Sequence, residues 1–515
     1  MPSLSVAFKK HSNDKFYGFF HRSDKKCFLS LENTLEDLND KMYKTIPRDI
    51  NEKHEDLEDI DNLYLKTIEN CKEYLIKFCS ITITKEAKNR KYIVQLLLNH
   101  CTKERLLFKD EALSAINSKN DNLKWRDVLA EARTEKIDIT NRDDIGRAGA
   151  GTSEILTIGK GDNIKFFKDE EKLGNIKDKI NELLDNVKDE NAKNLYSKIL
   201  LSKSFGKGLS YSDFINITTM KTTQERKQFI NSMQLLSKND LAKFSDEQID
   251  EFSNIFSSIS KADNLNYFAT QLAKIDKNSI ISHRNVATSR MGDLLGIGNL
   301  VAKSKRAKIK ENGKQTRVGN LMDKAKGIPV FELETLKANN PKLKFRITPN
   351  AQKELIALQV LDTICGQIDR NLGNYFISIT QSGNIVNIDS IQAIDNDLAF
   401  GKLKLTASRD NNQLPAFIDK DGNATLSHID KDIAEKVLGL SPNTLKFIFA
   451  DLLSSSEIDA LIDRLEQVKL AIESNSQKQG FMLDNASWNE TTLQDLSKGN
   501  NYVATLMGLI NDLNK

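Results

Sequence analysis

Three polar side chains in the second half of the chain have the types and spacing that phosphoryl transfer requires. Asp369 and Asn374 lie five positions apart, and Asp395 ends a strand-like segment about twenty residues later. An aspartate can orient an attacking hydroxyl and accept its proton, whereas an asparagine and a second aspartate are hard oxygen donors suited to Mg²⁺ beside phosphates. We therefore interpret Asp369 as a catalytic base and Asn374 and Asp395 as metal ligands. The alternative is that all three are turn-forming residues between strands.

A glycine-rich segment and a lysine upstream would complete the phosphate site. Gly149 and Gly151 stand between predicted strands, and Lys168 ends the next strand, Ile164-Lys-Phe-Phe-Lys168. Glycines let backbone amides approach phosphate oxygens, and a strand cation neutralises the α- and β-phosphates. Lys165 is the competitor for this role, but its side chain points to the opposite face of the strand. Because glycines also make ordinary hairpins and strand-end lysines are often solvent-exposed, these residues gain their meaning from the downstream acids.

Hydrophobic periodicity predicts the elements that position these groups. A helix with Ile356, Val360 and Ile364 on one face leads into the first aspartate, and two short strands follow as a hairpin. The chain before about residue 137 and the segment from about 173 to 280 are predicted to be mainly helical. The other predictions are a helix at Asn285–Leu295 closed by Gly296, a strand at Val318–Met322, the hairpin strands Tyr375–Ile379 and Ile385–Ile388, and a helix with Ser456 as its N-cap.

Composition excludes several classes of protein. The 515 residues are enough for two to four domains, and a net charge of +3 gives no reason to expect nucleic-acid binding. The five cysteines form no CxxC pair and the six histidines lie at no ligand spacing, which predicts reduced thiols and neither a disulfide frame nor a zinc site. The sequence shows no signal peptide and no apolar run long enough to span a membrane. We therefore expect a cytosolic protein.

These motifs resemble those of atypical members of the protein kinase superfamily. The segment Phe167-Lys168-Asp-Glu170 is similar to their strand lysine motif, and Asp369, Asn374 and Asp395 match their catalytic and metal positions. The segment Asn285–Gly296 looks like the helix that follows the lysine strand. The similarity is greatest to actin-fragmin-kinase-like and phosphoinositide-kinase-like proteins, including secreted effector kinases of Legionella-type intracellular bacteria. It covers roughly residues 143–455.

The resemblance implies an α+β fold with a two-lobed, protein-kinase-like core and large helical additions. It implies ATP as cofactor with Mg²⁺ or Mn²⁺, Gly149 and Gly151 over the nucleotide, and a hinge near Met322 and Asp323 that receives adenine through backbone groups. The expected acceptor is a protein Ser or Thr hydroxyl. A secreted effector of this kind would carry virulence functions inside the host-cell cytoplasm.

The chain departs from the kinase pattern at three places. Gln367 occupies the place of the histidine in His-Arg-Asp, and Asp395-Asn-Asp replaces Asp-Phe-Gly. The helix after the lysine strand carries no carboxylate near Asn285, where one should pair with the lysine. Glu170 or Glu171 could substitute, or an activator could position the lysine. We therefore expect activity to depend on an activator.

A basic run between that helix and the hinge is the candidate activator site. It would bind a polyanion such as an inositol phosphate, a phosphoinositide headgroup or an acidic protein, because clustered cations attract multiply charged anions. The alternative is a solvated hairpin. Its members are Lys303, Lys305, Arg306, Lys308, Lys310, Lys314 and Arg317.

The expected organisation has four parts: residues 1–137 as a helical accessory domain, 138–330 as the first lobe with its insertion, 331–479 as the second lobe, and 480–515 as a helical extension. Three other functions stay open. The chain could be a phosphoinositide kinase, a kinase-fold interaction protein without catalysis, or an enzyme that transfers AMP. A peripheral membrane contact would fit the first of these.

Overall fold

The computed structural model describes most of the chain. The described residues are 22–79, 85–117, 123–139, 145–148, 155–170, 173, 176–200, 220–232, 242, 244–311, 316–403, 426, 428–478 and 480–515.

The first lobe is built on a six-stranded sheet with the order β1-β5-β6-β4-β3-β2. Neighbouring strands are antiparallel except β1, which pairs parallel to β5. Phe167 is fully buried in the core of this sheet with Leu156 and Leu321. The strands predicted at Ile164–Lys168 and Val318–Met322 are confirmed as β4 and β6. The six are β1 (Glu135–Ile139), β2 (Ile145–Ala148), β3 (Ile155–Ile158), β4 (Lys165–Asp169), β5 (Ser304–Glu311) and β6 (Arg317–Asp323).

Helix α12 (His283–Leu294) connects the sheet to the second lobe. Nearly all of its side chains are buried, because it contacts β5 and β6 on one side and α14 on the other. Gly296 follows it with φ of +70°, a conformation that glycine adopts without strain. The helix predicted at Asn285–Leu295 is therefore confirmed, and it begins two residues earlier than expected.

The second lobe surrounds the buried helix α14 (Pro349–Cys365). The Thr348 side chain caps this helix by accepting from the Ala351 amide, and Gly366 ends it in the left-handed conformation with φ of +66°. A four-stranded sheet of order β7-β9-β10-β8 lies beside it and contains the predicted hairpin. These strands are β7 (Ile328–Pro329), β8 (Lys344–Ile347), β9 (Tyr375–Ser382) and β10 (Ile385–Ala393), with α13 (Glu332–Asn339) between the first two.

The rest of the second lobe is helical. Arg464 is buried on α17 and donates to the backbone carbonyls of Ile364 and Cys365, which ties this helix to the end of α14. The remaining elements are α15 (Lys431–Gly439), α16 (Pro442–Phe449), α17 (Ser455–Asn475), the paired strands β11 (Ile429–Asp430) and β12 (Met482–Leu483), α18 (Glu490–Leu496) and α19 (Tyr502–Asn514).

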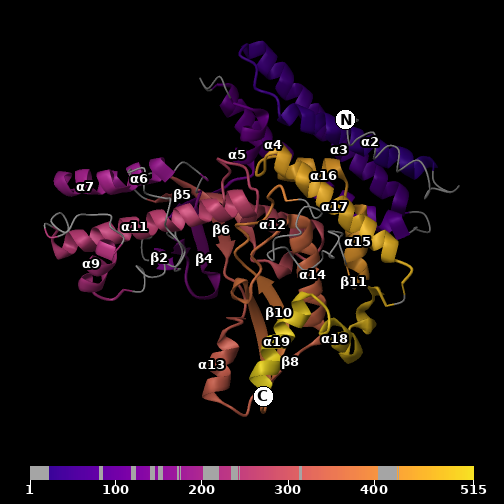
Figure 1. Cartoon of the computed structure of the whole chain (residues 1–515). Coiled ribbons are helices and arrows are strands. Elements are labelled where there is room, and N and C mark those ends of the chain that lie inside the picture. Colours follow the sequence, from indigo (N-terminus) through magenta and orange to yellow (C-terminus); the bar gives the residue numbers. More distant parts are fainter. Residues whose placement is uncertain are drawn as a thin grey trace.

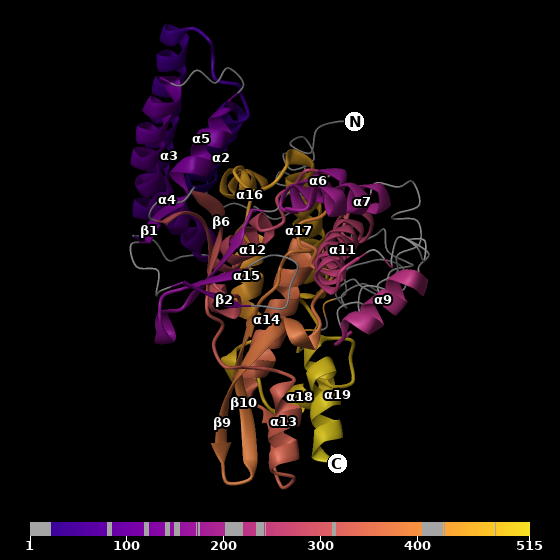
Figure 2. The same cartoon turned by 90° about the vertical axis from the view of Figure 1, so that its left-hand side faces the viewer.

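The N-terminal helices pack directly on the second lobe. α4 contacts α15, and α2 contacts α16, so the apolar side chains of both regions form one continuous core. Figure 2 shows these helices at one end of the molecule, with β9, β10, α13 and α19 at the other. They are α2 (Arg22–Met42), α3 (Ile50–Cys79), α4 (Lys85–Ile116) and α5 (Trp125–Ala132).

The helical insertion has a core of its own. Tyr196, Ile249, Phe252 and Phe256 are buried within it, apart from the main core. Figure 1 shows the insertion projecting from the side of the first lobe. Its helices are α6 (Ile176–Asp185), α7 (Glu190–Leu200), α9 (Thr223–Ser232) and α11 (Asp246–Tyr267). The predicted α+β fold, with a two-lobed core and large helical additions, is therefore confirmed. The likeness of that core to kinases and the exact domain boundaries stay predictions.

One capping prediction is wrong. Helix α17 is capped by Ser454 and not by Ser456. The Ser454 side chain accepts from the Glu457 amide while the Glu457 carboxylate accepts from the Ser454 amide, which closes a capping box. Ser456 lies inside the first turn, where its hydroxyl donates to Asp276. Among the described helices, none is long and apolar enough to cross a membrane.

Candidate active site

The loop after α14 presents Asp369 to solvent at the junction of the two lobes. Asp369 is exposed, and its Oδ1 accepts a hydrogen bond of 3.0 Å from the Asn371 amide nitrogen. The Asn374 side-chain nitrogen donates to the Asp369 backbone carbonyl at 2.5 Å. This bond uses the nitrogen of the Asn374 amide, so its oxygen is the atom available to a cation. The loop therefore holds the proposed base and the proposed ligand in one rigid turn.

Arg370 anchors this loop. Its buried guanidinium forms two bonds to the Asp362 carboxylate of α14, at 2.9 and 3.0 Å. It also donates to the carbonyl oxygens of Asn374 and Ile394, at 3.0 and 2.6 Å. The residue thus joins the catalytic loop to the segment that carries Asp395. The sequence analysis missed Arg370, although an arginine beside a candidate base and eight residues from an interior aspartate is a usable signal.

Asp395 lies where the chain leaves β10. Gln367, which stands in place of the expected histidine, donates from its side chain to the Asp395 carbonyl at 3.0 Å. Asp395 has φ of +55°, and this left-handed conformation is uncommon outside glycine. The residue is exposed, but protein atoms crowd its carboxyl group and the charges of Asp397 and Asp369 act on it. Loss of solvation and the charge of Asp397 raise the pKa of Asp395 to about 6, against the lowering effect of Lys168.

Lys168 reaches across from β4 to this cluster. Its Nζ lies 2.5 Å from the Asp397 carboxylate, two residues beyond the proposed metal ligand Asp395. The competitor Lys165 turns to the other face of the strand, where it pairs with Asp323 at 3.3 Å. Lys168 contacts the segment of Asp395 through Asp397, and Gln367 and Arg370 join that segment to the loop of Asp369. The structure therefore brings the four charged groups Lys168, Asp369, Asp395 and Asp397 into one site.

The structure describes two of the predicted nucleotide contacts, Met322 and Asp323. Met322 and Asp323 end β6, directly before the connection to the second lobe. Asp323 is exposed and its amide donates to the Lys303 carbonyl at 2.8 Å. Gly149 and Gly151 lie outside the described residues. Their contacts with a nucleotide stay predictions.

The basic run lies mostly on β5 and β6, and most of it is already paired. Lys308 contacts Glu131 at 2.6 Å, and Lys305 contacts Glu135 at 3.3 Å. Lys303 pairs with Asp293, and Arg317 pairs with Asp169. Arg306 pairs with Glu170, Lys310 is exposed, and Lys314 lies outside the described residues.

Glu170 holds α12 against the sheet instead of holding Lys168. Its Oε1 lies 3.0 Å from His283 Nε2 at the start of α12 and 2.6 Å from Arg306 Nε on β5. Burial opposes ionisation of this carboxyl, but the hydrogen bonds from His283 and Arg306 outweigh it and lower the pKa of Glu170 to about 2. The carboxylate is therefore ionised and committed to these two partners. Glu171 lies outside the described residues.

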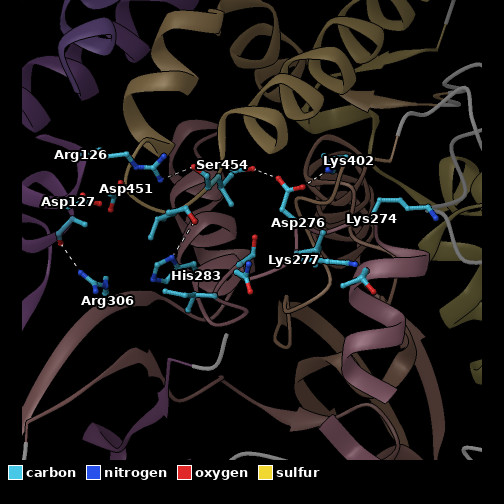
Figure 3. A pocket seen from close by; sticks show the side chains of 18 of the residues that line it. Arg126, Asp127, Lys274, Asp276, Lys277, His283, Arg306, Lys402, Asp451 and Ser454 are labelled. Atoms are coloured by element: carbon cyan, nitrogen blue, oxygen red, sulfur yellow. Dashed lines mark hydrogen bonds and ion pairs between the residues drawn. The ribbon is translucent and has the colours of Figure 1, made fainter. Parts of the chain in front are cut away.

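A separate cavity of about 910 Å³ lies beside the first turn of α12. It is lined by residues of α5, of the connection between α11 and α12, and of the connection between α16 and α17. Figure 3 shows Arg126 and Arg306 on one side and Lys274 and Lys277 on the other. None of the four groups around Asp395 lines this cavity. Because His283 forms part of its wall, a molecule bound here would contact α12.

The oxygen donors of Asn374 and Asp395 suit Mg²⁺ bound together with phosphates. Among the described residues, no group of three or more His, Cys, Asp and Glu side chains is arranged to hold a metal by itself. Magnesium bound with a nucleotide needs one or two protein ligands, since phosphates and water supply the rest. Asn374 and Asp395 carry oxygen atoms of this kind, and Lys168 carries a positive charge; their roles as metal ligands and phosphate contact stay predictions.

Comparison with known proteins finds one weak structural similarity and no sequence match. No family model matches the chain, and no curated protein matches it. Among solved structures, the chain is similar to the Toxoplasma gondii kinase Ron13 in a kinase-dead mutant form, with a TM-score of 0.23 and 13% identity. The match covers 64% of this chain and 35% of that one, so this chain matches about a third of the other's length. A TM-score of 0.23 is too low to indicate a shared function.

Proposed function

We propose that the chain is an ATP- and Mg²⁺-dependent kinase that transfers the γ-phosphate to a protein Ser or Thr hydroxyl. One observation carries the proposal. Lys168 from the sheet of the first lobe contacts Asp397, two residues after Asp395, in the second lobe. Gln367 and Arg370 join the segment of Asp395 to the loop of Asp369, so these groups come together in the chain order that phosphoryl transfer uses. If these residues only formed turns, this convergence would have no explanation, because turn residues need no cation from a strand two hundred residues away.

Each group has a role that follows from its position. Asp369 is exposed and fixed by Asn371, so its carboxylate can accept the proton of an acceptor hydroxyl. Lys168 would hold the α- and β-phosphates, while the oxygens of Asn374 and Asp395 would hold the cation. Bound Mg²⁺ would supply the positive charge that offsets the phosphate oxygens as the transfer proceeds. Arg370 keeps the two loops in register with each other.

The test is phosphotransfer by the purified full chain with labelled ATP and Mg²⁺. We expect Asp369→Ala and Asp395→Ala each to reduce the rate at least about 100-fold, since general-base catalysis and charge neutralisation each supply factors of this size. Asp459→Asn is the matched control, because this aspartate is exposed on α17, outside the two loops that carry Asp369 and Asp395. Failure of the wild-type chain to bind Mg-ATP, with or without polyanions, would overturn the proposal and favour an interaction protein.

The acceptor class is decided in the same assay. One arm contains a mixture of unrelated proteins, and the other contains vesicles of mixed phosphoinositides. Label in protein at Ser or Thr supports the proposal, whereas label in lipid identifies a phosphoinositide kinase. Intact-mass measurement of the product distinguishes a phosphate from an AMP group. Location in a host-cell cytoplasm stays a prediction from the family resemblance.

Activation by an inositol phosphate or another polyanion is part of the proposal. The basic run supports it less than the sequence suggested, because an incoming anion must compete with Glu131 and Glu135 for Lys308 and Lys305. Lys305 and Lys310 are the exposed members and therefore the useful test positions. We expect Lys305→Gln with Lys310→Gln to weaken stimulation by inositol hexakisphosphate without changing basal activity. If stimulation by inositol hexakisphosphate is undiminished in this variant, the basic run is not the activator site.

A further inference from the structure

Helix α12 has no carboxylate available to Lys168. Its single acidic residue, Asp293, lies near its far end and pairs with Lys303. The helix position that faces Lys168's partner is occupied by Asn285, which is buried with 5% of its surface exposed. Without an anionic partner, a strand lysine would not be held in the position from which it contacts phosphates. The partner must therefore come from another part of the chain.

Asp397 supplies that partner, and both of its carboxylate oxygens are engaged. Its Oδ2 lies 2.5 Å from Lys168 Nζ, and its Oδ1 accepts a hydrogen bond of 2.6 Å from the Asn285 amide nitrogen. Asp397 is 7% exposed. A carboxylate held by two donors in so enclosed a place has a fixed orientation, because rotation would leave one donor unsatisfied.

Asn285 also grips the residue before Asp397. Its Oδ1 accepts from the backbone amide of Asn396 at 2.9 Å, while its nitrogen donates to Asp397. The two ends of one amide thus fix two consecutive residues of the second lobe. A carboxylate at position 285 could not do this, because it would lack the donor and would repel Asp397. The asparagine and the aspartate form a complementary pair.

Glu170, two residues after Lys168, is committed to other partners. Glu170 contacts both His283 and Arg306, and these contacts point it toward α12 and β5. It serves to fix the helix, and Asp397 serves to fix the lysine. Arg290 strengthens this arrangement from the same helix, since it binds Asp451 of the second lobe at 2.7 and 2.9 Å.

We propose that Asp397 is the counter-ion that positions Lys168 for phosphate binding, and that Asn285 is the positioning residue that orients Asp397. The role in phosphate binding rests on the proposed kinase function, whereas the contacts among Lys168, Asp397 and Asn285 do not depend on it. In kinases of the usual design the lysine and its acid both belong to the first lobe. Here the acid belongs to the second lobe, directly after Asp395. The position of Lys168 is therefore set by contact between the lobes.

The first experiment measures coupling without any nucleotide. Urea unfolding of the full chain is compared for Lys168→Met, Asp397→Asn and the double variant. We expect each single variant to raise the unfolding equilibrium constant by about tenfold, and the double variant to raise it little more than one of them does, since contacting residues are non-additive. Lys168→Met with Glu170→Gln is the matched cycle and should be additive. Additivity of the Lys168 and Asp397 changes would overturn the inference.

The second experiment measures Mg-ATP affinity and separates positioning from stability. We expect Asn285→Ala to weaken Mg-ATP about fivefold or more, and Asn285→Asp to weaken it further, because the added carboxylate repels Asp397. The exchange Asn285→Asp with Asp397→Asn restores a donor and an acceptor across the 2.6 Å contact. It should recover the stability that Asn285→Asp loses by repulsion, but not affinity, because the carboxylate then lies away from Lys168.

Full recovery of affinity in the exchanged variant would show that the pair is merely structural. If wild type binds no Mg-ATP while the unfolding cycle still shows coupling, the proposed function fails and the Lys168–Asp397 pairing stands. The two failures are therefore distinguishable.

Discussion

Replacing Asp451 with asparagine should destabilise the chain far more than its hydrogen-bond lengths alone suggest. Asp451 follows α16 and is fully buried, and its carboxylate contacts Arg133 at 2.5 Å and Arg290 at 2.7 and 2.9 Å. Arg133 in turn binds Glu104 of α4 at 2.6 Å. One carboxylate therefore joins the N-terminal helices, α12 and the second lobe.

The magnitude follows from burial. Removing one partner of a buried ion pair leaves a charge without compensation and costs about 3–5 kcal/mol. Arg290 has 17% of its side chain exposed and can recover some hydration, whereas Arg133 has 5%. We therefore expect Asp451→Asn to lower the free energy of unfolding by about 3–4 kcal/mol. Since α12 carries Asn285, phosphotransfer should fall as well.

The assay is urea unfolding followed by circular dichroism, with Asp512→Asn as the matched control. Asp512 contacts Lys515 at 2.7 Å, like the buried pair, but both side chains are more than 70% exposed. Its replacement should change the free energy of unfolding by less than about 0.5 kcal/mol. Arg290→Lys gives a milder perturbation if Asp451→Asn does not fold. Equal effects of the Asp451 and Asp512 variants would refute the argument from burial.

The same variant has a defined pH dependence. Burial opposes ionisation of Asp451, but the charges of Arg290 and Arg133 hold the pKa of this carboxyl well below its usual range. A lowered pKa in the folded state means that the stabilisation is complete above about pH 4 and is lost as the pH falls below it. The difference between wild type and Asp451→Asn should therefore be constant from pH 8 to 5 and shrink in stronger acid. A difference that grows on acidification would contradict the assigned sign.

Two further predictions concern Tyr502 and His100, which lie outside the candidate site. The Tyr502 hydroxyl of α19 donates to Asp362, the partner of Arg370, at 3.0 Å, so Tyr502→Phe should cost about 1.5–3 kcal/mol of stability and slow phosphotransfer. Tyr196→Phe removes a comparable hydroxyl from the separate core of the insertion and should leave phosphotransfer unchanged; equal losses of activity in both variants would exclude a specific role for α19. Burial lowers the pKa of His100 to about 4, so stability should rise between pH 4 and 6.5, where the unfolded chain binds the additional proton. His100→Gln should flatten this part of the stability profile, measured by urea unfolding at several pH values, and an unchanged profile would assign the effect to other groups.

Much of the local structure could be predicted from the chain itself. Alternation and turn residues located β4, β6 and the hairpin of β9 and β10, because a strand's own side chains record which face is buried. The helix α12 was predicted at Asn285–Leu295 as a helix closed by Gly296. The cap of α17 was placed two residues late, since Ser454 and Ser456 are equally good acceptors and Glu457, by reaching back, decides between them.

The chain by itself determined the donor types of the candidate site and their order. Lys168, Asp369, Asn374 and Asp395 were identified because hard oxygen donors and a strand cation have recognisable spacing. Only the tertiary structure showed which of these groups lie together and which other residues connect them. Asp397 pairs with a lysine 229 positions away, and Asn285 reaches it from a helix 112 positions away. Periodicity shows that a residue is buried. The partner of a buried charge depends instead on how distant elements pack, and the residues around the charge in the sequence do not reveal it.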